Sequence, residues 1–282
     1  MKGKITLQEK FKTLQQQKQA LLATNFYNFE TLKGLLLAAS TVKKPLILQL
    51  TRSSIDYMGL PVAIQLAESM LEYYNVEGWV HLDHGDSFEL VASCLDAGFQ
   101  SVMSDASERS FEENIKITKA VVKLAEKYGA NVEAELGYVP KLGQDAGKIG
   151  FTEPAEATFF VEETGVNALA IAIGSAHGFY KEDPKLDLDR LSAIKSVTKA
   201  ALVLHGASGI PHPVLREAVQ RGICKINLAT EIKNIFMKSL KNKLANENEI
   251  DLRKVFPCAT DEVNQLVQEK LLAIHVEEFN KI

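Results

Sequence analysis

Short apolar runs alternate along the chain with longer segments whose apolar positions recur every three or four residues. A run that is apolar on both faces and is followed by an amphipathic segment is typical of a parallel strand covered by a helix. The pattern predicts eight strands, at residues 21–24, 46–50, 79–82, 101–103, 131–136, 168–173, 201–204 and 223–226.

Eight such units in 282 residues favour an α/β fold, a closed (β/α)8 TIM barrel that uses about 30 residues per unit. Residues 108–129 show the helical period well, with Ile115, Val122 and Ala125 on one face and Gly129 at the expected C-cap. The alternative is a doubly wound open sheet, which usually carries a GxGxxG motif after its first strand. Here no such motif follows the first strand.

The two ends of the chain add to the barrel. The polar, periodic segment 1–19 predicts an N-terminal surface helix that caps the fold. Residues 240–282 exceed what a barrel needs and predict a polar loop and a terminal helix from Asp261 onward. We therefore predict one domain over residues 1–282, with a C-terminal helical extension from about residue 240.

Composition excludes several classes of protein. Hydrophobic residues are 46% and charged residues 24%, which is the balance of a globular protein with a full core. The net charge is −4 and the charges alternate in sign, so neither a nucleic acid nor a membrane is an expected partner. No apolar run approaches the roughly 18 residues of a membrane helix. The three scattered cysteines form no CxxC pair, which suits a reducing cytoplasm.

Barrel enzymes place their chemistry at the carboxyl ends of the strands. Every predicted strand ends near a polar or ionisable residue. These residues are Asn25, Thr51, Asp83, His84, Asp105, Glu135, His177, His205 and Asn227. A polar residue at the end of one strand would carry no information, but polar residues at the ends of all eight strands indicate an active site.

Three of the six histidines, His84, His177 and His205, follow separate strands. Neutral imidazoles that converge at one barrel mouth make a divalent metal site with open positions. A single strand-end histidine is as often structural, but the set of three favours a metal. Structural roles are expected for the other three, with His81 in the core or behind a ligand and His212 and His275 on helices.

Three carboxylates stand near the predicted metal. Asp83 is adjacent to His84 and could act as a general acid or base, or could orient a histidine. Asp105 and Glu135 could form a secondary metal position, or could be hydrogen-bonded carboxylates of the barrel rim.

Small residues follow the last two predicted strands, in the turns Gly206-Ala207-Ser208-Gly209 and Asn227-Leu228-Ala229-Thr230. Barrels often bind phosphate in these two loops, through backbone N–H groups and a helix N-terminus. A metal, a carboxylate and a phosphate pocket together suit carbon–carbon cleavage of a phosphorylated sugar, with the metal polarising the ketone oxygen.

The chain resembles the class II, metal-dependent ketose-bisphosphate aldolases, in the branch of the tagatose-bisphosphate and shorter fructose-bisphosphate aldolases. Matching motifs run in one order over nearly the whole chain. They are TNFYNFET (24–31), VHLDHGDSFE (80–89), DAGFQSVMSDAS (96–107), NVEAELG (131–137), IGSAHGFYK (173–181), LVLHGASGIP (202–211), GICKINLATE (222–231) and DLRK (251–254).

The resemblance implies roles for individual residues. Zn2+ would be held by His84, His177 and His205, with Asp105 and Glu135 at a second, weaker position, and Asp83 would exchange the proton of the C4 hydroxyl. The products of cleavage would be dihydroxyacetone phosphate and glyceraldehyde 3-phosphate. Contacts to dihydroxyacetone phosphate would come from Gly178, Gly206, Ala207, Ser208, Asn227, Leu228, Ala229 and Thr230.

The resemblance also implies features at the distal end of the substrate and between subunits. Asn25 and Thr51 match substrate-side positions, and a monovalent cation (Na+ or K+) is usual near the phosphate loops. Arg253 matches an arginine that reaches the distal phosphate in a neighbouring subunit, which implies a homodimer or homotetramer.

The loop after the fifth strand departs from the family pattern. It normally reads like GG(Q/E)ED, whose Glu removes a proton from dihydroxyacetone phosphate, but here it is YVPKLGQDAGKIG (138–150). Asp145 is the nearest carboxylate and is expected to take over as base. Arg52, in LTRSS, is also unusual, and is either a surface charge or a selector of an aldehyde with an extra anionic group.

Three alternatives stay open at this point. The chain could be an aldolase for a different phosphorylated ketose or keto-sugar acid. It could be a barrel hydrolase that uses a metal-bound hydroxide, although the first strand offers only Asn25 where an HxH motif is expected. It could also be a non-catalytic sugar-phosphate-binding member of the family, since the loop Glu is missing.

Overall fold

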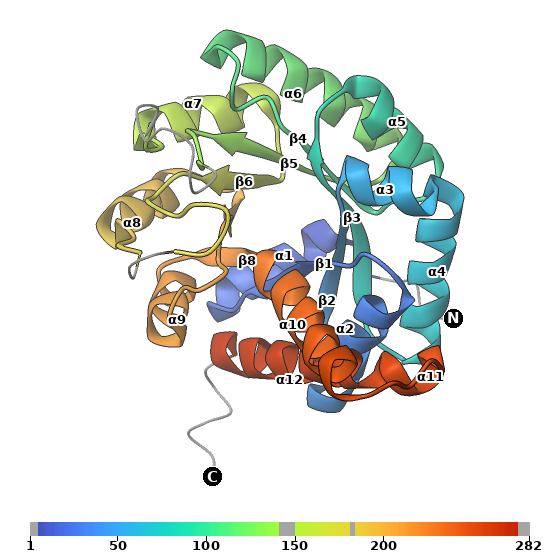
Figure 1. Cartoon of the computed structure of the whole chain (residues 1–282). Helices are drawn as coiled ribbons and strands as arrows, with labels where there is room; N and C mark the ends of the chain where they lie inside the picture. Colours follow the sequence, from blue (N-terminus) through green and yellow to red (C-terminus); the bar gives the residue numbers. More distant parts are fainter. Residues whose placement is uncertain (1–4, 141–149, 181–183, 276–282) are drawn as a thin grey trace.

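The computed structural model describes residues 5–140, 150–180 and 184–275. Eight parallel strands close into a barrel in sequence order, with β1 paired to both β2 and β8. Helices form a ring outside the strands (Figure 1). The predicted (β/α)8 barrel is confirmed, and the open doubly wound sheet is excluded.

All eight strands lie where the hydrophobic runs predicted them. They are β1 Leu21–Asn25, β2 Leu46–Leu50, β3 Gly78–Gly85, β4 Ser101–Ser104, β5 Asn131–Leu136, β6 Ala168–Ile171, β7 Ala201–Leu204 and β8 Ile223–Leu228. The largest difference is at β3, which continues through Asp83 and His84 instead of ending before them.

The helices that cover the barrel follow each strand. They are α2 Phe29–Val42, α3 Arg52–Met58, α4 Leu60–Tyr73, α5 Phe88–Asp96, α6 Phe111–Ala125, α7 Pro154–Thr164, α8 Leu188–Val197, α9 His212–Gln220 and α10 Thr230–Asn246. Helix α2 begins at a capping box in which the side chain of Asn28 accepts a hydrogen bond from the Thr31 amide. Such an N-cap contributes about 1 kcal/mol.

The region predicted as a helix over 108–129 is α6 followed by a 3-10 turn, Glu126–Tyr128. Gly129 adopts a left-handed φ of 62° at its end, as predicted. The most deeply buried face of α6 carries Asn114, Thr118, Val121 and Ala125. Of the residues predicted to face the core, Ala125 lies on this face, whereas Ile115 and Val122 are only partly buried. The Asn114 amide donates to the Glu135 carbonyl, which satisfies a polar group inside this face.

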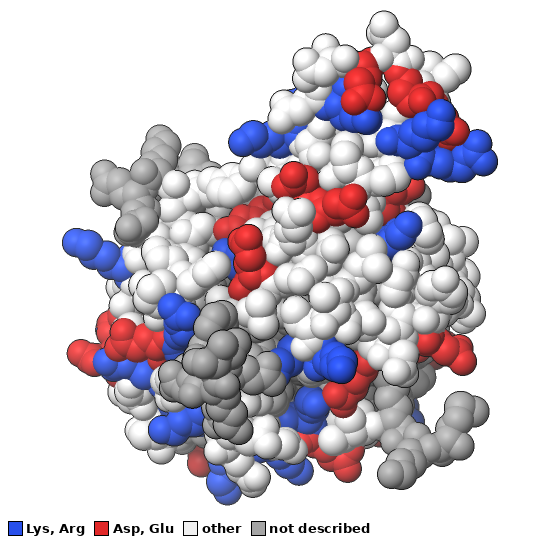
Figure 2. Space-filling model, turned by 90° about the horizontal axis from the view of Figure 1, so that it is seen from below, with Lys and Arg blue, Asp and Glu red and all other residues white. Residues whose placement is uncertain are grey.

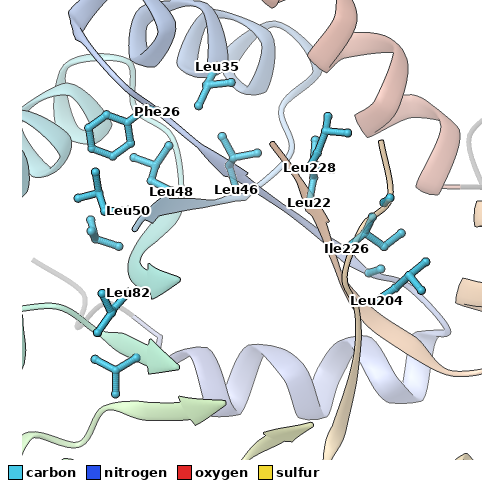
Figure 3. Close-up of a cluster of buried hydrophobic side chains, with 14 of the residues drawn as sticks. Leu22, Phe26, Leu35, Leu46, Leu48, Leu50, Leu82, Leu204, Ile226 and Leu228 are labelled. Carbon is cyan, nitrogen blue, oxygen red and sulfur yellow. The ribbon is translucent and has the colours of Figure 1, made fainter. Parts of the chain in front are cut away.

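Alternate residues along each strand divide between two hydrophobic clusters. Leu22, Leu48 and Leu82 belong to the large cluster between the strands and the outer helices (Figure 3). Leu21 and Trp79, on the opposite faces of their strands, belong to a small cluster inside the barrel. Because side chains alternate along a strand, the residues two or four positions after these interior ones also point into the barrel.

The amino-terminal end of the barrel is closed by α1, Leu7–Gln17. Leu7, Phe11 and Leu14 on one face of this helix are buried in the interior cluster. The indole nitrogen of Trp79 donates to the Ile5 carbonyl and ties the helix entry to β3. The predicted N-terminal capping helix is therefore confirmed, and it leaves the opposite end of the barrel for the site.

The C-terminal extension is more helical than predicted. Helix α10 continues to Asn246, a short helix α11 spans Leu252–Val255, and α12 spans Pro257–Ile274. The terminal helix thus begins at Pro257 and not at Asp261, because proline suits the first turn, where an N–H has no helical acceptor. Helix α12 packs closely on α2, where a side chain at Gly34 would lie 2.8 Å from the Thr260 carbonyl oxygen.

The surface carries both signs of charge. Figure 2 shows Lys and Arg interspersed with Asp and Glu on the face that it displays. Within the described part of the chain, no helix has the length and apolarity needed to cross a bilayer.

Candidate active site

A pocket of about 1070 Å³ opens at the carboxyl end of the barrel. Most of the predicted site residues line it. They are Asn25, Thr51, Asp83, His84, Asp105, Glu135, His177, Gly178, Gly206, Ser208, Asn227, Ala229 and Thr230. The predicted convergence of strand ends is therefore present in the structure.

Asp83 lies on β3 four residues after Trp79 and so points into the barrel. Its Oδ2 accepts a hydrogen bond from the Asn25 amide at 2.8 Å, and its Oδ1 accepts one from Gln49 at 3.2 Å. Burial raises the pKa of Asp83, but nearby His84, His205 and Lys225 and the bond from Asn25 outweigh burial and hold it below its usual range. The site therefore contains a buried but ionised carboxylate.

His84 should face outward by strand alternation, yet it lies in the pocket. Its φ is 52°, a left-handed value that is uncommon for a residue other than glycine. The pairing of β3 with β4 shifts register between Leu82 and Gly85, and a side chain at Gly85 would lie 2.4 Å from the Met103 carbonyl oxygen. This local irregularity turns His84 toward the barrel axis, as strained backbone often does at functional sites.

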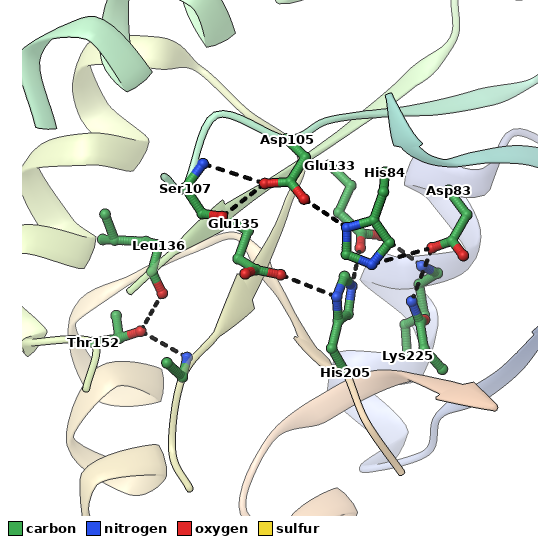
Figure 4. A network of polar contacts seen from close by, with 12 residues as sticks. Asp83, His84, Asp105, Ser107, Glu133, Glu135, Leu136, Thr152, His205 and Lys225 are labelled. Carbon is green, nitrogen blue, oxygen red and sulfur yellow. Dashed lines mark hydrogen bonds and ion pairs between the residues drawn. The ribbon is translucent and has the colours of Figure 1, made fainter. Parts of the chain in front are cut away.

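The ring of His84 is oriented by the end of β4. Its Nδ1 donates to Asp105 Oδ2 at 2.6 Å, and the other oxygen of Asp105 accepts from the Ser107 hydroxyl at 2.7 Å (Figure 4). With Nδ1 engaged, Nε2 of His84 faces the pocket, 3.9 Å from Asp83 Oδ1. Asp105 is thus a hydrogen-bonded carboxylate of the barrel rim, and its position also allows the predicted secondary metal position.

His205 follows β7 and is fully buried under the pocket. Its Nε2 donates to Glu133 Oε1 at 2.9 Å, and its Nδ1 lies 3.1 Å from Glu135 Oε2. Burial lowers the pKa of His205, but the hydrogen bonds to Glu133 and Glu135 outweigh it and raise the pKa to about 10.

His177 lies on the loop after β6, where its amide donates to the Pro140 carbonyl at 2.8 Å. Its ring centroid is 5.2 Å from that of His84 and 5.7 Å from that of His205. Burial and the two neighbouring histidines lower its pKa to about 3. The imidazole is therefore neutral near pH 7, as a metal ligand must be.

The three imidazoles fit a divalent metal ion. One nitrogen from each of His84, His177 and His205 lies within 4.8 Å of the other two. The Nδ1 of His205 and the Oε2 of Glu135 are buried and face this cluster, and among the described residues each has only the other as a polar partner, at 3.1 Å. A second group of atoms with the same spacing comes from His84, Asp105 and Glu135. Nitrogen and carboxylate donors of this kind suit zinc.

The loops after β6, β7 and β8 supply another part of the pocket wall, where Asn227 Nδ2 lies 3.5 Å from Asp83 Oδ1. Gly178, Gly206, Ser208, Asn227 and Thr230 line it. Thr230 begins α10, and its N-cap residue, Ala229, has no capping side chain. The Glu231 amide of this first turn donates to the Ser208 hydroxyl at 3.3 Å, so the helix N-terminus and a hydroxyl lie together where an anion could bind. Among the described residues, Ala207 and Leu228 depart from this pattern, because their side chains are buried in the core and do not line the pocket.

Gly206 holds the β7 loop against the β6 loop, and we expect Gly206→Ala to lower the melting temperature and the activity together. Its φ is 68°, and an added Cβ would lie 2.4 Å from the Ala176 carbonyl oxygen. Gly129→Ala is the matched control, because Gly129 has φ of 62° but open space around it. The left-handed backbone alone costs about 1–2 kcal/mol, so thermal denaturation should show a clearly larger loss for Gly206→Ala. Equal losses would contradict the close-approach argument.

Three other predicted positions have different outcomes. Arg52 makes a bidentate ion pair with Asp86 and also donates to Ser87, so its charge is already matched. Arg253 lies on α11, where its side chain is 90% exposed and pairs with Asp251. Asp145 lies outside the residues that the structure describes.

Several residues of the site were not predicted. Tyr27, Arg109 and Lys233 line the pocket, and Lys233 Nζ lies 5.6 Å from the centre of the Tyr27 ring. Glu133 and Lys225 lie beneath it as a buried ion pair. Strand parity could have placed both residues inside the barrel, though it could not have shown their pairing. Glu133 precedes Glu135 by two residues and Lys225 precedes Asn227 by two, so each shares an interior face with a predicted site residue.

Comparison with known proteins finds similar sequences and similar structures. The model of the class-II fructose-bisphosphate aldolase family matches residues 5–278. A fructose-bisphosphate aldolase from Helicobacter pylori is 38% identical over 279 residues, which cover 88% of this chain and 91% of that protein. The crystal structure of the YdjI aldolase from Escherichia coli K12 superposes with a TM-score of 0.87 and 30% identity, over 97% of this chain and 98% of that one. The fructose-bisphosphate aldolase of Campylobacter jejuni shares the fold, with a TM-score of 0.82 and 20% identity, over 96% of this chain and 95% of that one.

Proposed function

Since the chain belongs to the class-II fructose-bisphosphate aldolase family and is an aldolase, a carbon–carbon lyase, we propose that it is zinc-dependent and cleaves a ketose 1,6-bisphosphate. The substrate would be fructose or tagatose 1,6-bisphosphate, and the products dihydroxyacetone phosphate and glyceraldehyde 3-phosphate. The observation that carries the proposal is the cluster of three imidazoles with an ionised carboxylate, Asp83, 3.9 Å from one of them.

The metal would be held by His84, His177 and His205, with Glu135 and Asp105 close enough to form a second position. When bound, Zn2+ would polarise the ketone oxygen of the substrate. The hydrogen bonds from His84 to Asp105 and from His205 to Glu133 orient the two rings, so that one nitrogen of each faces the cluster.

Asp83 would accept the proton of the C4 hydroxyl during cleavage and return it during condensation. Asn25 and Gln49 hold its two oxygens, and its lowered pKa keeps it ionised near pH 7. A group that exchanges a proton must be within hydrogen-bond reach of it, which places the C4 hydroxyl against this carboxylate. The second base of the reaction, which we assign to Asp145, would come from the loop after β5.

The first phosphate group would lie against the loops after β6, β7 and β8. Gly178, Gly206, Ser208 and Asn227 offer a small, polar wall there, and Thr230 adds the N-terminus of α10. Ala207, Leu228 and Ala229 would contribute backbone only. A monovalent cation bound to carbonyl oxygens of these loops would offset the phosphate charge.

The distal end of the substrate would lie on the side of β1 and β2, where Thr51 and Tyr27 line the pocket. Arg52 is engaged by Asp86, so it offers no free charge to a second anionic group. Arg109 and Lys233 line the pocket and make no ion pair with another described residue. These two cations could bind the phosphate of an aldehyde substrate. They could equally bind another anionic group, which keeps the second candidate, an aldolase for another phosphorylated ketose or keto-sugar acid.

Condensation of dihydroxyacetone phosphate with a panel of aldehydes, with metal analysis of the same sample, tests the proposal. We expect stoichiometric zinc and a preference for glyceraldehyde 3-phosphate of at least about tenfold over neutral aldehydes, because a charge-assisted hydrogen bond contributes about 1.5–3 kcal/mol. A preference for an aldehyde that carries a carboxylate would favour the second candidate. Release of inorganic phosphate without aldol products would contradict both.

Lys233→Met should raise the KM for a ketose bisphosphate about tenfold or more, because it removes a cation that lies near Tyr27 and has no carboxylate partner among the described residues. Condensation of dihydroxyacetone phosphate with glycolaldehyde, which lacks a distal anion, is the internal control and should change little. Steady-state kinetics with both aldehydes check this prediction. Equal losses in the two reactions would show that Lys233 does not recognise the distal group.

We also propose a homodimer or homotetramer in the cytoplasm, where sugar phosphates are metabolised. The exposed guanidinium of Arg253 supports this, since it lies on α11 at the outside of the barrel and would reach a neighbouring subunit's pocket. The mass in solution, measured by light scattering, tests the assembly.

A further inference from the structure

A buried chain of charged groups runs across the barrel beneath the pocket. Lys225 Nζ on β8 lies 2.8 Å from Glu133 Oε2 on β5, and both side chains have 0% exposure. The other oxygen of Glu133 accepts a hydrogen bond from His205 Nε2 at 2.9 Å (Figure 4). Burying two charges costs several kcal/mol each before their attraction offsets it, so a pair with this placement calls for an explanation beyond barrel packing.

The neighbours of Glu133 show what this carboxylate does. A carboxylate can only accept, so the nitrogen of His205 that faces it must carry a hydrogen. When the ring is neutral, as it must be to bind a metal, its lone pair therefore belongs to Nδ1, which faces the metal cluster and lies 3.1 Å from Glu135 Oε2. Two acceptor atoms at this distance repel unless a proton or a cation lies between them. Glu133 thereby selects which nitrogen of His205 is offered to a metal ion.

Lys225 contacts Glu133 and not a predicted metal ligand. It lies 3.4 Å from His81 Nε2, and His81 Nδ1 is hydrogen-bonded to Ser101 at 2.7 Å, so the ammonium group is enclosed by polar partners. Neither Lys225 nor Glu133 is among the described residues that line the pocket. They therefore have no direct path to the substrate and can reach the chemistry only through His205.

We propose that Glu133 and Lys225 are positioning residues for the metal site, with Glu133 fixing the tautomer and orientation of His205 and Lys225 balancing the buried carboxylate charge. The inference rests on the proposed metal site and deepens it. The competing explanation is that the ion pair only stabilises the barrel. The two explanations differ in what happens when both charges are removed together.

The test compares Glu133→Gln, Lys225→Met and the double variant in the full-length protein. Each single variant leaves one buried charge unpaired, so both should lower the melting temperature of the metal-free protein. The double variant removes both charges at nearly constant volume and should recover much of that loss. The zinc dissociation constant, from competition with a chromophoric chelator, should nevertheless stay raised about 10- to 100-fold in Glu133→Gln and in the double variant.

A second readout and a control separate the explanations. Cobalt substituted for zinc should give an altered visible absorption spectrum in the double variant, because the His205 ligand is less firmly held. Lys270→Met breaks another largely buried ion pair, with Glu231, and should lower stability while leaving the zinc dissociation constant unchanged. If the double variant recovers both the stability and the zinc affinity of the wild type, the inference about Glu133 and Lys225 is wrong, but the proposed metal site still stands. A wild-type protein that binds no divalent metal would overturn both the site and the inference.

Discussion

Replacing Asp83 by asparagine should lower kcat for cleavage by about 10²- to 10⁴-fold, the range expected when a general acid–base group is removed. The Asp83 carboxylate is ionised, lines the pocket and lies 3.9 Å from His84 Nε2, the nitrogen that Asp105 leaves free. An amide of the same shape cannot take up a proton near pH 7. The KM should change much less, because the proposed phosphate contacts come from the loops after β6, β7 and β8 and not from Asp83.

The fold should tolerate this substitution. Gln49 Oε1 makes no hydrogen bond with a described residue, so the Gln49 amide can turn and accept a hydrogen bond from the introduced asparagine side chain. Asp189→Asn is the matched control, since it makes the same chemical change at a surface ion pair with Arg221 and should leave kcat within about twofold. Circular dichroism and zinc content should match the wild type for both variants. A loss of kcat in Asp83→Asn that disappears when zinc is restored would assign Asp83 to metal binding instead.

The sequence predicted the barrel well because each strand is a continuous apolar run, and such runs are read directly from hydrophobicity. It also predicted which residues gather at the pocket, because the ends of parallel strands meet at one rim. The position of His84 could not be predicted in this way. The alternation of side chains along β3 predicts that His84 points outside the barrel. The register shift near Gly85 and the left-handed φ of His84 turn it inward.

The charged residues inside the strands show a second limit. Glu133 and Lys225 interrupt apolar runs, and a charge in a strand ordinarily indicates a solvent-exposed face. Their pairing crosses the barrel between β5 and β8 and is visible only once the barrel closes. Arg52 illustrates the converse. It stood out in the sequence as a candidate for substrate selection, but Asp86 on the next strand's loop satisfies it.

Exhaustive chelation should abolish cleavage, and added zinc should restore it. A bound metal contributes several kcal/mol to the stabilisation of the developing charge, and each 1.4 kcal/mol is about tenfold in rate, so we expect a loss of at least about 10³-fold. The melting temperature should fall when the metal is removed and rise again when zinc is added, because zinc would bind only the folded arrangement of His84, His177 and His205.

The same experiment tests a rival chemistry. Aldolases without a metal can activate a ketone as an imine on a lysine, and Lys225 lies inside this barrel. Its Nζ is fully buried and paired with Glu133, below the residues that line the pocket, so it is not placed to attack a substrate carbonyl. Borohydride added with dihydroxyacetone phosphate should therefore leave the protein mass unchanged. Cleavage that persists without metal, together with a borohydride-trapped adduct on Lys225, would contradict the metal-dependent mechanism.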